Sequence, residues 1–181
     1  DMPVQHGSEK VLKDMKRGFG PYGIKKRIEK LRNVNSNIAI RTSIIVGFPG
    51  ETDKEFRELL DFIQEIEFDR LGVFTYSEEE GTHGADAYVD NVPADVKDQR
   101  KEEVMLLQQS INLKKNKDLI GSKERVLIDV CNAEGVSLGR TYRDSPEIDN
   151  YVKIYEKLEP GMFYDIKITD AMEYDLIGES C

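Results

Sequence analysis

One stretch of the sequence decides the fold: residues 41–52 read RTSIIVGFPGET. Residues 38–47 are rich in β-branched side chains, which predicts a buried strand. The Gly-Phe-Pro-Gly segment ends that strand, and Thr52 with Glu55 three residues later forms a capping-box signal for the next helix. A strand that leads directly into a helix is the repeating step of a parallel α/β sheet.

Helices and strands alternate on both sides of this stretch. Residues 8–32 carry apolar side chains at helical spacing, with a Gly-Phe-Gly-Pro break at residues 18–21, so two helices are expected there. Apolar positions within residues 56–66 give the helix after the strand one apolar stripe, and residues 69–77 predict another strand. The alternation predicts an α/β fold for this part of the chain.

The pattern changes after an expected loop at residues 83–92. Pro93 is expected to begin a long charged helix over residues 93–117, with its apolar positions along one face. Residues 119–181 then hold five short period-two segments separated by Gly, Asp, Pro and Asn, which predicts a small five-stranded antiparallel β-barrel. We therefore expect two domains, residues 1–118 and residues 119–181.

The composition limits the possible functions. The 181 residues carry 26 Lys plus Arg against 35 Asp plus Glu, a formal net charge of -9. This balance disfavours unaided binding to nucleic acid and favours a cationic partner or plain solubility. No run of about 18 apolar residues occurs, so no membrane association is expected. Two cysteines, Cys131 and Cys181, support neither a disulfide scaffold nor a four-ligand metal site, and a cytoplasmic setting is expected.

The glycines of residues 47–52 could serve a ligand or only a turn. At a strand-to-helix junction they let the backbone approach an anion. The same punctuation is also common in purely structural turns, and both interpretations stay open. The segment lacks the lysine of a phosphate-binding P-loop and the spacing of a dinucleotide fingerprint. Nucleoside triphosphate chemistry is therefore disfavoured.

Alternation along the predicted strand places Arg41, Ser43 and Ile45 on one face. An arginine flanked by apolar residues is costly to bury unless a carboxylate or a ligand anion meets it. An internal salt bridge and a bound carboxylate would satisfy Arg41 equally well. On the next strand, Phe74 and Tyr76 alternate toward one side in the same way.

The two histidines are weak candidates for chemistry. His6 is expected at a strand end before a helix, where α/β sheets and barrels place ligand groups, but a solitary histidine is more often structural. His83 lies close to the acidic run at residues 78–80, which could bind a metal. A solvated acidic loop is the favoured interpretation.

Taken together, several stretches resemble the C-terminal half of the radical SAM methylthiotransferases. They are DMPVQHGS at residues 1–8, MKRG at 15–18, RTSIIVGFPGET at 41–52 and FTYSEEEGT at 74–82. The β-rich end is similar to that family's TRAM domain, so the resemblance covers nearly the whole chain. Residues 68–82 and EYDLIG at residues 173–178 favour the type that modifies an aspartate of protein twelve of the small ribosomal subunit. The tRNA-adenosine type is the alternative.

The resemblance implies a partial, half TIM-like radical SAM barrel followed by an OB-like TRAM barrel. It implies S-adenosylmethionine bound at one 4Fe-4S cluster and a second 4Fe-4S cluster that handles the sulfur. Reductive cleavage would give a 5′-deoxyadenosyl radical, which abstracts hydrogen from the β-carbon of the target before a methylthio group is attached. Combined with strand alternation, the resemblance assigns cofactor binding to Gln5, Arg41, Ser43, Ile45 and Phe74.

The sequence departs from the family in its cysteines. The family's three-cysteine cluster motif and the three cysteines of its N-terminal domain have no counterpart here. Because the chain also starts within an apparent strand end, we expect it to be a fragment of a longer enzyme that binds neither cluster stably and is inactive alone. A non-catalytic module that binds a basic protein or RNA is the alternative.

Charge indicates what the predicted β-barrel binds. Residues 123–181 hold 7 basic and 13 acidic side chains, a net charge of -6. Such a surface repels a phosphate backbone and attracts a cationic ribosomal protein. The expected substrate contacts are Glu147, Asp149, Glu173 and Asp175. The alternative is that these acids only solubilise the surface, because single exposed charges contribute little. A monomer is expected.

Overall fold

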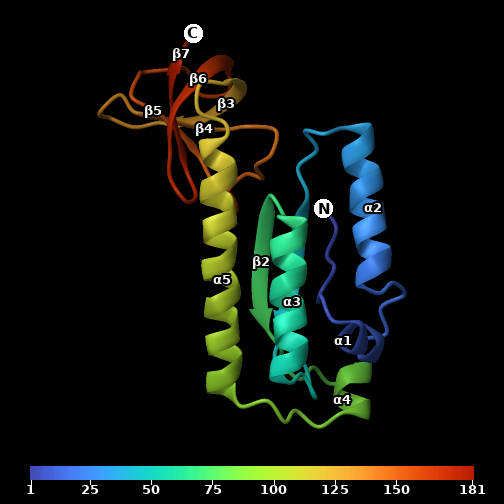
Figure 1. Cartoon of the computed structure of the whole chain (residues 1–181). Helices are drawn as coiled ribbons and strands as arrows, with labels where there is room; N and C mark the ends of the chain where they lie inside the picture. The colour runs from blue at the N-terminus through green and yellow to red at the C-terminus, as the bar shows by residue number, and fades with distance from the viewer. The chain divides into compact units, whose positions relative to one another are not determined.

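The computed structural model describes all residues from 1 to 181, and they divide into two compact units, Asp1–Gln108 and Gln109–Cys181 (Figure 1). The first unit is mixed α/β and the second is a closed β-barrel. No helix is both long enough and apolar enough to span a bilayer.

Three parallel segments form the sheet of the first unit. β1 (Arg41–Val46) pairs with β2 (Arg70–Thr75) in parallel. Residues 2–5 run along the other edge of β1, where a parallel bridge joins Gln5 to Ile44. Parallel neighbours joined through helices are the expected α/β arrangement.

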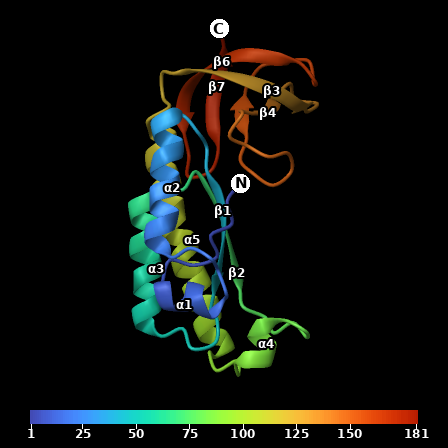
Figure 2. The same ribbon diagram turned by 90° about the vertical axis from the view of Figure 1, so that its right-hand side faces the viewer.

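Helices α2 (Pro21–Val34) and α3 (Asp53–Ile66) cover one face of this sheet (Figure 2). The other helices are α1 (Glu9–Asp14), α4 (His83–Ala87), which follows the carboxyl end of β2, and α5 (Ala94–Lys117). The β1 side chains Thr42, Ile44 and Val46 are buried, whereas Ser43 and Ile45 on the opposite face are only half-buried. The strand alternation therefore separates a packed face from an open one.

Local signals explain how the helices begin. The predicted capping box of α3 is confirmed: the Thr52 side chain accepts from the backbone of the first turn, and the Glu55 carboxylate accepts from the Thr52 N–H at 3.0 Å. The expected loop at residues 83–92 is wrong in part, because it contains α4. The Thr82 hydroxyl accepts from the Ala85 N–H at 3.4 Å and caps that short helix, a signal that its glycine-rich composition obscures.

α5 contacts the first unit through polar side chains as well as apolar ones. The predicted apolar positions include Val104, which is buried, but Lys97, Arg100 and Gln108 are buried too. Lys97 Nζ donates to the Tyr76 carbonyl at 3.1 Å, and Gln108 Nε2 donates to the carbonyl of residue 68 at 2.8 Å. These bonds pair the Lys97 ammonium and the Gln108 amide N–H with backbone carbonyls, which lowers the cost of burying a polar helix face.

The second unit is a closed barrel of five strands, ordered β3-β4-β5-β7-β6. They are β3 (Lys123–Cys131), β4 (Ser137–Arg140), β5 (Val152–Ile154), β6 (Phe163–Ala171) and β7 (Leu176–Ser180). The expectation of a wholly antiparallel barrel is wrong, because β5 and β7 pair in parallel. The reason is geometric: strand direction cannot alternate all the way around a closed ring with an odd number of strands.

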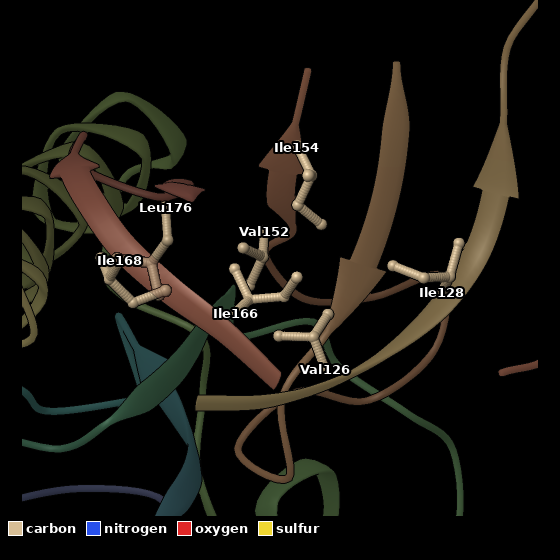
Figure 3. Packing of buried hydrophobic residues seen from close by; sticks show 7 residues of the cluster. All are labelled: Val126, Ile128, Val152, Ile154, Ile166, Ile168 and Leu176. Atoms are coloured by element: carbon tan, nitrogen blue, oxygen red, sulfur yellow. The ribbon is translucent and has the colours of Figure 1, made fainter. Parts of the chain in front are cut away.

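Aliphatic side chains fill the barrel. Seven buried residues form its core (Figure 3): Val126, Ile128, Val152, Ile154, Ile166, Ile168 and Leu176. They come from four of the five strands. The fifth strand, β4, has Gly139 at the core, where its backbone lies close to the side chains of Val126 and Ile128. The period-two pattern of the sequence places these side chains inward. The barrel therefore has a core of its own.

Candidate functional site

A cavity of about 620 Å³ opens at the carboxyl ends of β1 and β2. Its walls include Ile45 from β1, Phe74 and Thr75 from β2, and Phe48 and Tyr76 just beyond the two strands. This volume lies within the range of about 300 to 1,000 Å³ that is typical of small-molecule sites. The carboxyl edge of parallel strands is also where α/β folds place their ligands.

The structure brings four of the five predicted cofactor residues together. Gln5, Ser43, Ile45 and Phe74 all line the cavity, whereas Arg41 does not. Arg41 begins β1, opposite Arg70. Strand alternation predicts which face of the sheet carries Arg41, but it does not predict how far along the strand the cavity lies. At about 3.3 Å per residue, Arg41 lies roughly 13 Å before Ile45 along the strand. Cofactor binding by these five residues stays a prediction.

Gln5 reaches the cavity through an unusual backbone conformation. Its φ is 75°, in the left-handed region that disfavours residues other than glycine. Two hydrogen bonds hold it there: its N–H donates to the Ser43 carbonyl at 2.9 Å, and its carbonyl accepts from the Ile45 N–H at 2.8 Å. Such conformations cost about 1 to 3 kcal/mol and concentrate at ligand sites.

Tyr76 lines the cavity and carries a buried hydroxyl without a hydrogen-bond partner. Its N–H extends the sheet by donating to the Val46 carbonyl at 2.8 Å, and its ring packs edge-on against Phe48 with centroids 5.2 Å apart. Burial, followed by the charges of Glu78 and Asp90, raises the pKa of Tyr76, so the hydroxyl keeps its proton at neutral pH.

His6 is a structural residue. It is fully buried, and the Ser8 N–H donates to its Nδ1 at 2.9 Å. Since Nδ1 accepts, the proton of the neutral ring belongs on Nε2, which lies 3.2 Å from Glu51 Oε2 and donates to it. Both ring nitrogens are therefore used within the protein, in agreement with the interpretation favoured for a solitary histidine.

Glu51 holds the turn that follows β1. Besides His6, its carboxylate accepts from the Gly47 N–H at 2.9 Å and from Arg100 Nη1 at 3.0 Å. Arg100 also donates to Asp53 at 2.9 Å. Gly47 has a φ of 74°, which suits glycine. The backbone of this turn is thus committed to internal contacts, which supports the structural interpretation of the Gly-Phe-Pro-Gly segment.

Sequence reasoning did not assign several residues that complete the cavity. Two stretches supply them: Met15 and Arg17 after α1, and Ser77, Glu79, Thr82, His83 and Gly84 after β2. Residues 15, 17, 77, 79 and 82 belong to the motifs quoted for the resemblance, so their presence was a signal, whereas His83 and Gly84 follow those motifs. The sequence did not show that these two loops, which lie about 60 residues apart, meet in space.

The four predicted substrate residues of the barrel lie on two loops that touch. Tyr151 N–H donates to Asp175 Oδ1 at 3.0 Å, which joins the loop before β5 to the turn before β7. Asp149 Oδ2 accepts from the Ser145 N–H at 2.6 Å. Glu147 and Glu173 are exposed. The two aspartates therefore organise the loops, and substrate binding by all four stays a prediction.

No cluster of three or more His, Cys, Asp or Glu side chains in the chain has the geometry to hold a metal ion. The two cysteines are free thiols and both lie in the second unit.

Comparison with known proteins gives two family matches. Residues 1–63 match the radical SAM superfamily, and residues 120–181 match the TRAM domain. The chain also resembles coproporphyrinogen III oxidase (HemN) from Escherichia coli, a radical SAM enzyme, with a TM-score of 0.53 at 21% identity. That alignment covers 61% of this chain and 26% of the other, and it shows the fold alone.

Curated relatives match along almost the entire chain. Ribosomal protein uS12 methylthiotransferase RimO from Thermosipho melanesiensis is 47% identical over 99% of this chain. The proteins of the same name from Chromobacterium violaceum and Clostridioides difficile are each 44% identical over 99% of it. The chain spans about 41% of the length of the first two relatives. The chain therefore carries a radical SAM region and a TRAM domain, and along almost its whole length it is similar to radical SAM methylthiotransferases of the RimO type.

Proposed function

We propose that this chain supplies the cofactor-facing strands and the substrate module of an enzyme that attaches a methylthio group to the β-carbon of an aspartate in ribosomal protein uS12. The cavity at the ends of β1 and β2 carries the proposal, since it gathers Gln5, Ser43, Ile45 and Phe74 at one ligand-sized site. The relatives named for uS12 support the choice of substrate.

The residues of the cavity fit S-adenosylmethionine. Ile45, Phe48 and Phe74 offer apolar surface for the adenine, and 58% of Phe74 is exposed on the open side of the sheet. The Ser43 hydroxyl and the Gln5 amide suit the polar groups of the ribose and the methionine moiety. Mostly apolar walls with a few placed polar groups are the usual composition of a cofactor site.

Bound with an iron–sulfur cluster, S-adenosylmethionine supplies the radical chemistry needed to remove hydrogen from an unactivated carbon. The part of this chain is to bind and orient the cofactor along β1 and β2 and to exclude water from the reacting groups. Clusters require cysteine thiolates, and Cys131 and Cys181 are both in the barrel unit. We therefore propose that the ligands of both clusters come from sequence outside these 181 residues, and that these residues alone are inactive.

The barrel is proposed to dock uS12. Its net charge of -6 favours a cationic protein over a phosphate backbone. The loops that carry Glu147, Asp149, Glu173 and Asp175 are joined by the hydrogen bond from Tyr151 to Asp175. We place the domain boundary between residues 118 and 119, close to the start of the TRAM match at residue 120. We also propose that the protein is a cytoplasmic monomer.

Calorimetric titration of the chain with S-adenosylmethionine tests the cofactor site. Ile45→Asp places a charge in the apolar wall of the cavity and should abolish binding. Ile120→Asp makes the same change at an exposed position of the second unit and should bind like the wild type. Absence of binding by the wild-type chain, or equal binding by both variants, would contradict the proposed site.

A further inference from the structure

The first two helices carry a charge opposite to that of the chain as a whole. Residues 8–34, which include α1 and α2, hold nine basic and three acidic side chains, a net charge of +6 in a chain of net charge -9. The acidic excess therefore lies entirely in the rest of the sequence. The overall balance, which disfavours binding to nucleic acid, conceals a local basic region.

The outward side of α2 supplies part of this basic region. Ile24 and Ile28 are buried and mark the packed side of the helix, whereas Lys26, Arg27 and Lys30 are exposed. None of these three cations makes an ion pair within the chain. Lys26 and Lys30 lie four residues apart, so they are neighbours on the helix surface and repel each other. Because such a pair lowers helix stability, stability does not account for it.

Two exposed aromatic rings lie among these cations. The Lys26 ammonium lies 4.9 Å from the centroid of the Tyr22 ring, and the Arg27 guanidinium lies 3.5 Å from that of the Phe19 ring. Tyr22 is 70% exposed and Phe19 is 49% exposed, so both rings are accessible to a partner. Cations interleaved with exposed rings are typical of surfaces that bind single-stranded nucleic acid, where the rings stack on bases.

A hollow of about 340 Å³ continues this surface toward α1, which lies beside the start of α2 (Figure 1). Its walls come from residues 2–4, residues 16–19 and α2. Lys16, Arg17 and Arg27 line the hollow, and no acidic side chain does. Lys16 is exposed and makes no ion pair, whereas Arg17 donates to the Pro3 carbonyl at 2.9 Å. Cations without carboxylate partners make the local potential positive and attract an anion.

We propose that this basic surface binds a strand of RNA. The surface consists of four cations and two rings: Lys16, Lys26, Arg27, Lys30, Phe19 and Tyr22. The cations contact phosphate oxygens, and the rings stack on unpaired bases. The exposed rings favour RNA over an acidic protein. The choice of RNA also rests on the proposed function, because a ribosomal protein lies among RNA in the ribosome. This contact is separate from the proposed docking of uS12 on the acidic barrel.

The first experiment measures the fluorescence anisotropy of a labelled single-stranded RNA of about 12 nucleotides titrated with the 181-residue chain. The double variant Lys26→Gln/Lys30→Gln should weaken binding by about tenfold at low salt. It should also flatten the salt dependence, because each lost phosphate contact removes about 0.7 from the slope of log affinity against log salt. Its thermal unfolding should match that of the wild type, which shows that the variant is folded.

Lys54→Gln/Lys101→Gln is the matched control. It removes the same charge from two exposed lysines of the first unit, one on α3 and one on α5, which lie outside the basic surface. Its affinity for RNA and its salt dependence should equal those of the wild type. A loss as large as in Lys26→Gln/Lys30→Gln would show that net charge, and not this surface, determines binding, and would overturn the proposal.

The second experiment separates RNA from an acidic protein as the occupant. Tyr22→Ala should weaken RNA binding by about fivefold to a hundredfold and leave the salt dependence unchanged, because the ring contacts no phosphate. Polyglutamate of the same length should bind more weakly than the RNA and should not respond to Tyr22→Ala. If polyglutamate binds as tightly as the RNA, or if Tyr22→Ala does not affect RNA binding, the choice of RNA is overturned.

A second copy of the chain is the remaining occupant, since its barrel has a net charge of -6. Sedimentation velocity at low salt should show a monomer. An oligomer that Lys26→Gln/Lys30→Gln dissociates would assign the surface to a second copy and overturn the choice of RNA.

Failure of this proposal differs from failure of the proposed function. The Lys26→Gln/Lys30→Gln variant should bind uS12 as the wild type does, because the proposed docking of uS12 uses the barrel. RNA binding without uS12 binding by the wild-type chain would contradict the proposed function and support the RNA-binding surface. Binding of uS12 without RNA binding would overturn the RNA-binding surface alone.

Discussion

At the scale of single residues, left-handed backbone conformations occur next to the ligand cavity, and a buried carboxylate lies in the turn that follows β1. Lys16 adopts a left-handed conformation to close α1, and Gln5 does so beside β1. Glu51 is buried among His6, Gly47 and Arg100, with all its carboxylate contacts made inside the protein. Each of these residues departs from its ordinary preference, and local hydrogen bonds compensate.

The strain at Lys16 predicts a stabilising substitution. Lys16→Gly removes the left-handed penalty and should raise the free energy of unfolding by a few tenths to about 1 kcal/mol. Urea unfolding monitored by circular dichroism measures it. Lys13→Gly, inside α1, should instead lower stability by about 0.5 to 1 kcal/mol. Destabilisation by Lys16→Gly would show that its side chain has a separate role.

Glu51 and Asp53 both pair with the Arg100 guanidinium but differ in exposure. Neutralising each carboxylate should therefore lower the free energy of unfolding by a different amount. Glu51 is buried, whereas the side chain of Asp53 is 83% exposed. Glu51→Gln leaves Arg100 without its buried partner and should cost about 3 kcal/mol of unfolding free energy. Asp53→Asn should cost less than about 1 kcal/mol. Equal costs, measured by thermal unfolding, would refute the assignment of Glu51 as the anchor of the turn.

At the scale of elements, helix starts and strand contacts carry specific chemistry. α3 begins with a complete capping box, and its apolar residues pack on the sheet. In the barrel, Gly139 and Gly178 bring strands close enough that an added Cβ would overlap Val126 and Ile166, respectively. The capping box makes the stability of α3 depend on pH, and the glycines make the barrel sensitive to added volume.

The capping box gives a pH dependence of known sign. The Thr52 hydroxyl, as the largest cause, lowers the pKa of Glu55 below its ordinary value of 4.5. A lowered folded-state pKa contributes stability that is present above 4.5 and is lost as the pH falls through the folded value. The stability difference between wild type and Glu55→Gln should therefore shrink as the pH falls from about 7 to about 3. A difference that is constant across this range would contradict the ionised capping box.

Gly178→Ala tests the tight strand contact of the barrel. The new methyl group would overlap the Ile166 side chain and the Lys167 carbonyl, and relieving it should cost about 1 to 3 kcal/mol. Gly18→Ala is the control, because no atom lies within 4 Å of its added Cβ. The thermal unfolding of both variants is compared with the wild type. A neutral Gly178→Ala would mean that β6 and β7 can separate without loss of packing.

At the scale of the whole molecule, two compact units divide the work that we propose: the first presents the cofactor cavity, and the second presents an acidic barrel. The acidic residues of the barrel are spread over loops and strands, so their combined field matters more than any single pair. Partner choice should therefore depend on salt.

Titration of the chain with uS12 and with a tRNA stem-loop at two salt concentrations tests partner choice. Binding to uS12 should be tighter than binding to the stem-loop, and it should weaken as salt rises, because screening shortens the reach of the barrel's charge. Replacing Glu147 and Glu173, which are exposed, by glutamine should weaken uS12 binding. Tighter binding to the RNA would reverse our choice of substrate.

Much of this architecture follows from the sequence alone. Period-two and helical spacing, Thr52 with Glu55, and the glycine punctuation are local signals, because each depends on residues a few positions apart. They determined the α/β unit, the long helix and the five barrel strands. Alternation also determined that Ser43 and Ile45 share a face. The motif resemblance added the similarity to radical SAM methylthiotransferases, which the relatives confirm.

Only the tertiary structure decided which residues meet. Arg17 and Glu79 line one cavity although 62 residues separate them, and His6 meets Glu51 across 45 residues. Alternation assigned Arg41 the correct face, but only the strand register shows that it lies at the end of β1 remote from the cavity. Closure of a five-stranded ring requires at least one parallel pair, and the structure places that pair at β5 and β7. Contacts of this kind depend on how helices and strands pack against one another. A pattern among residues a few positions apart carries no information about that packing.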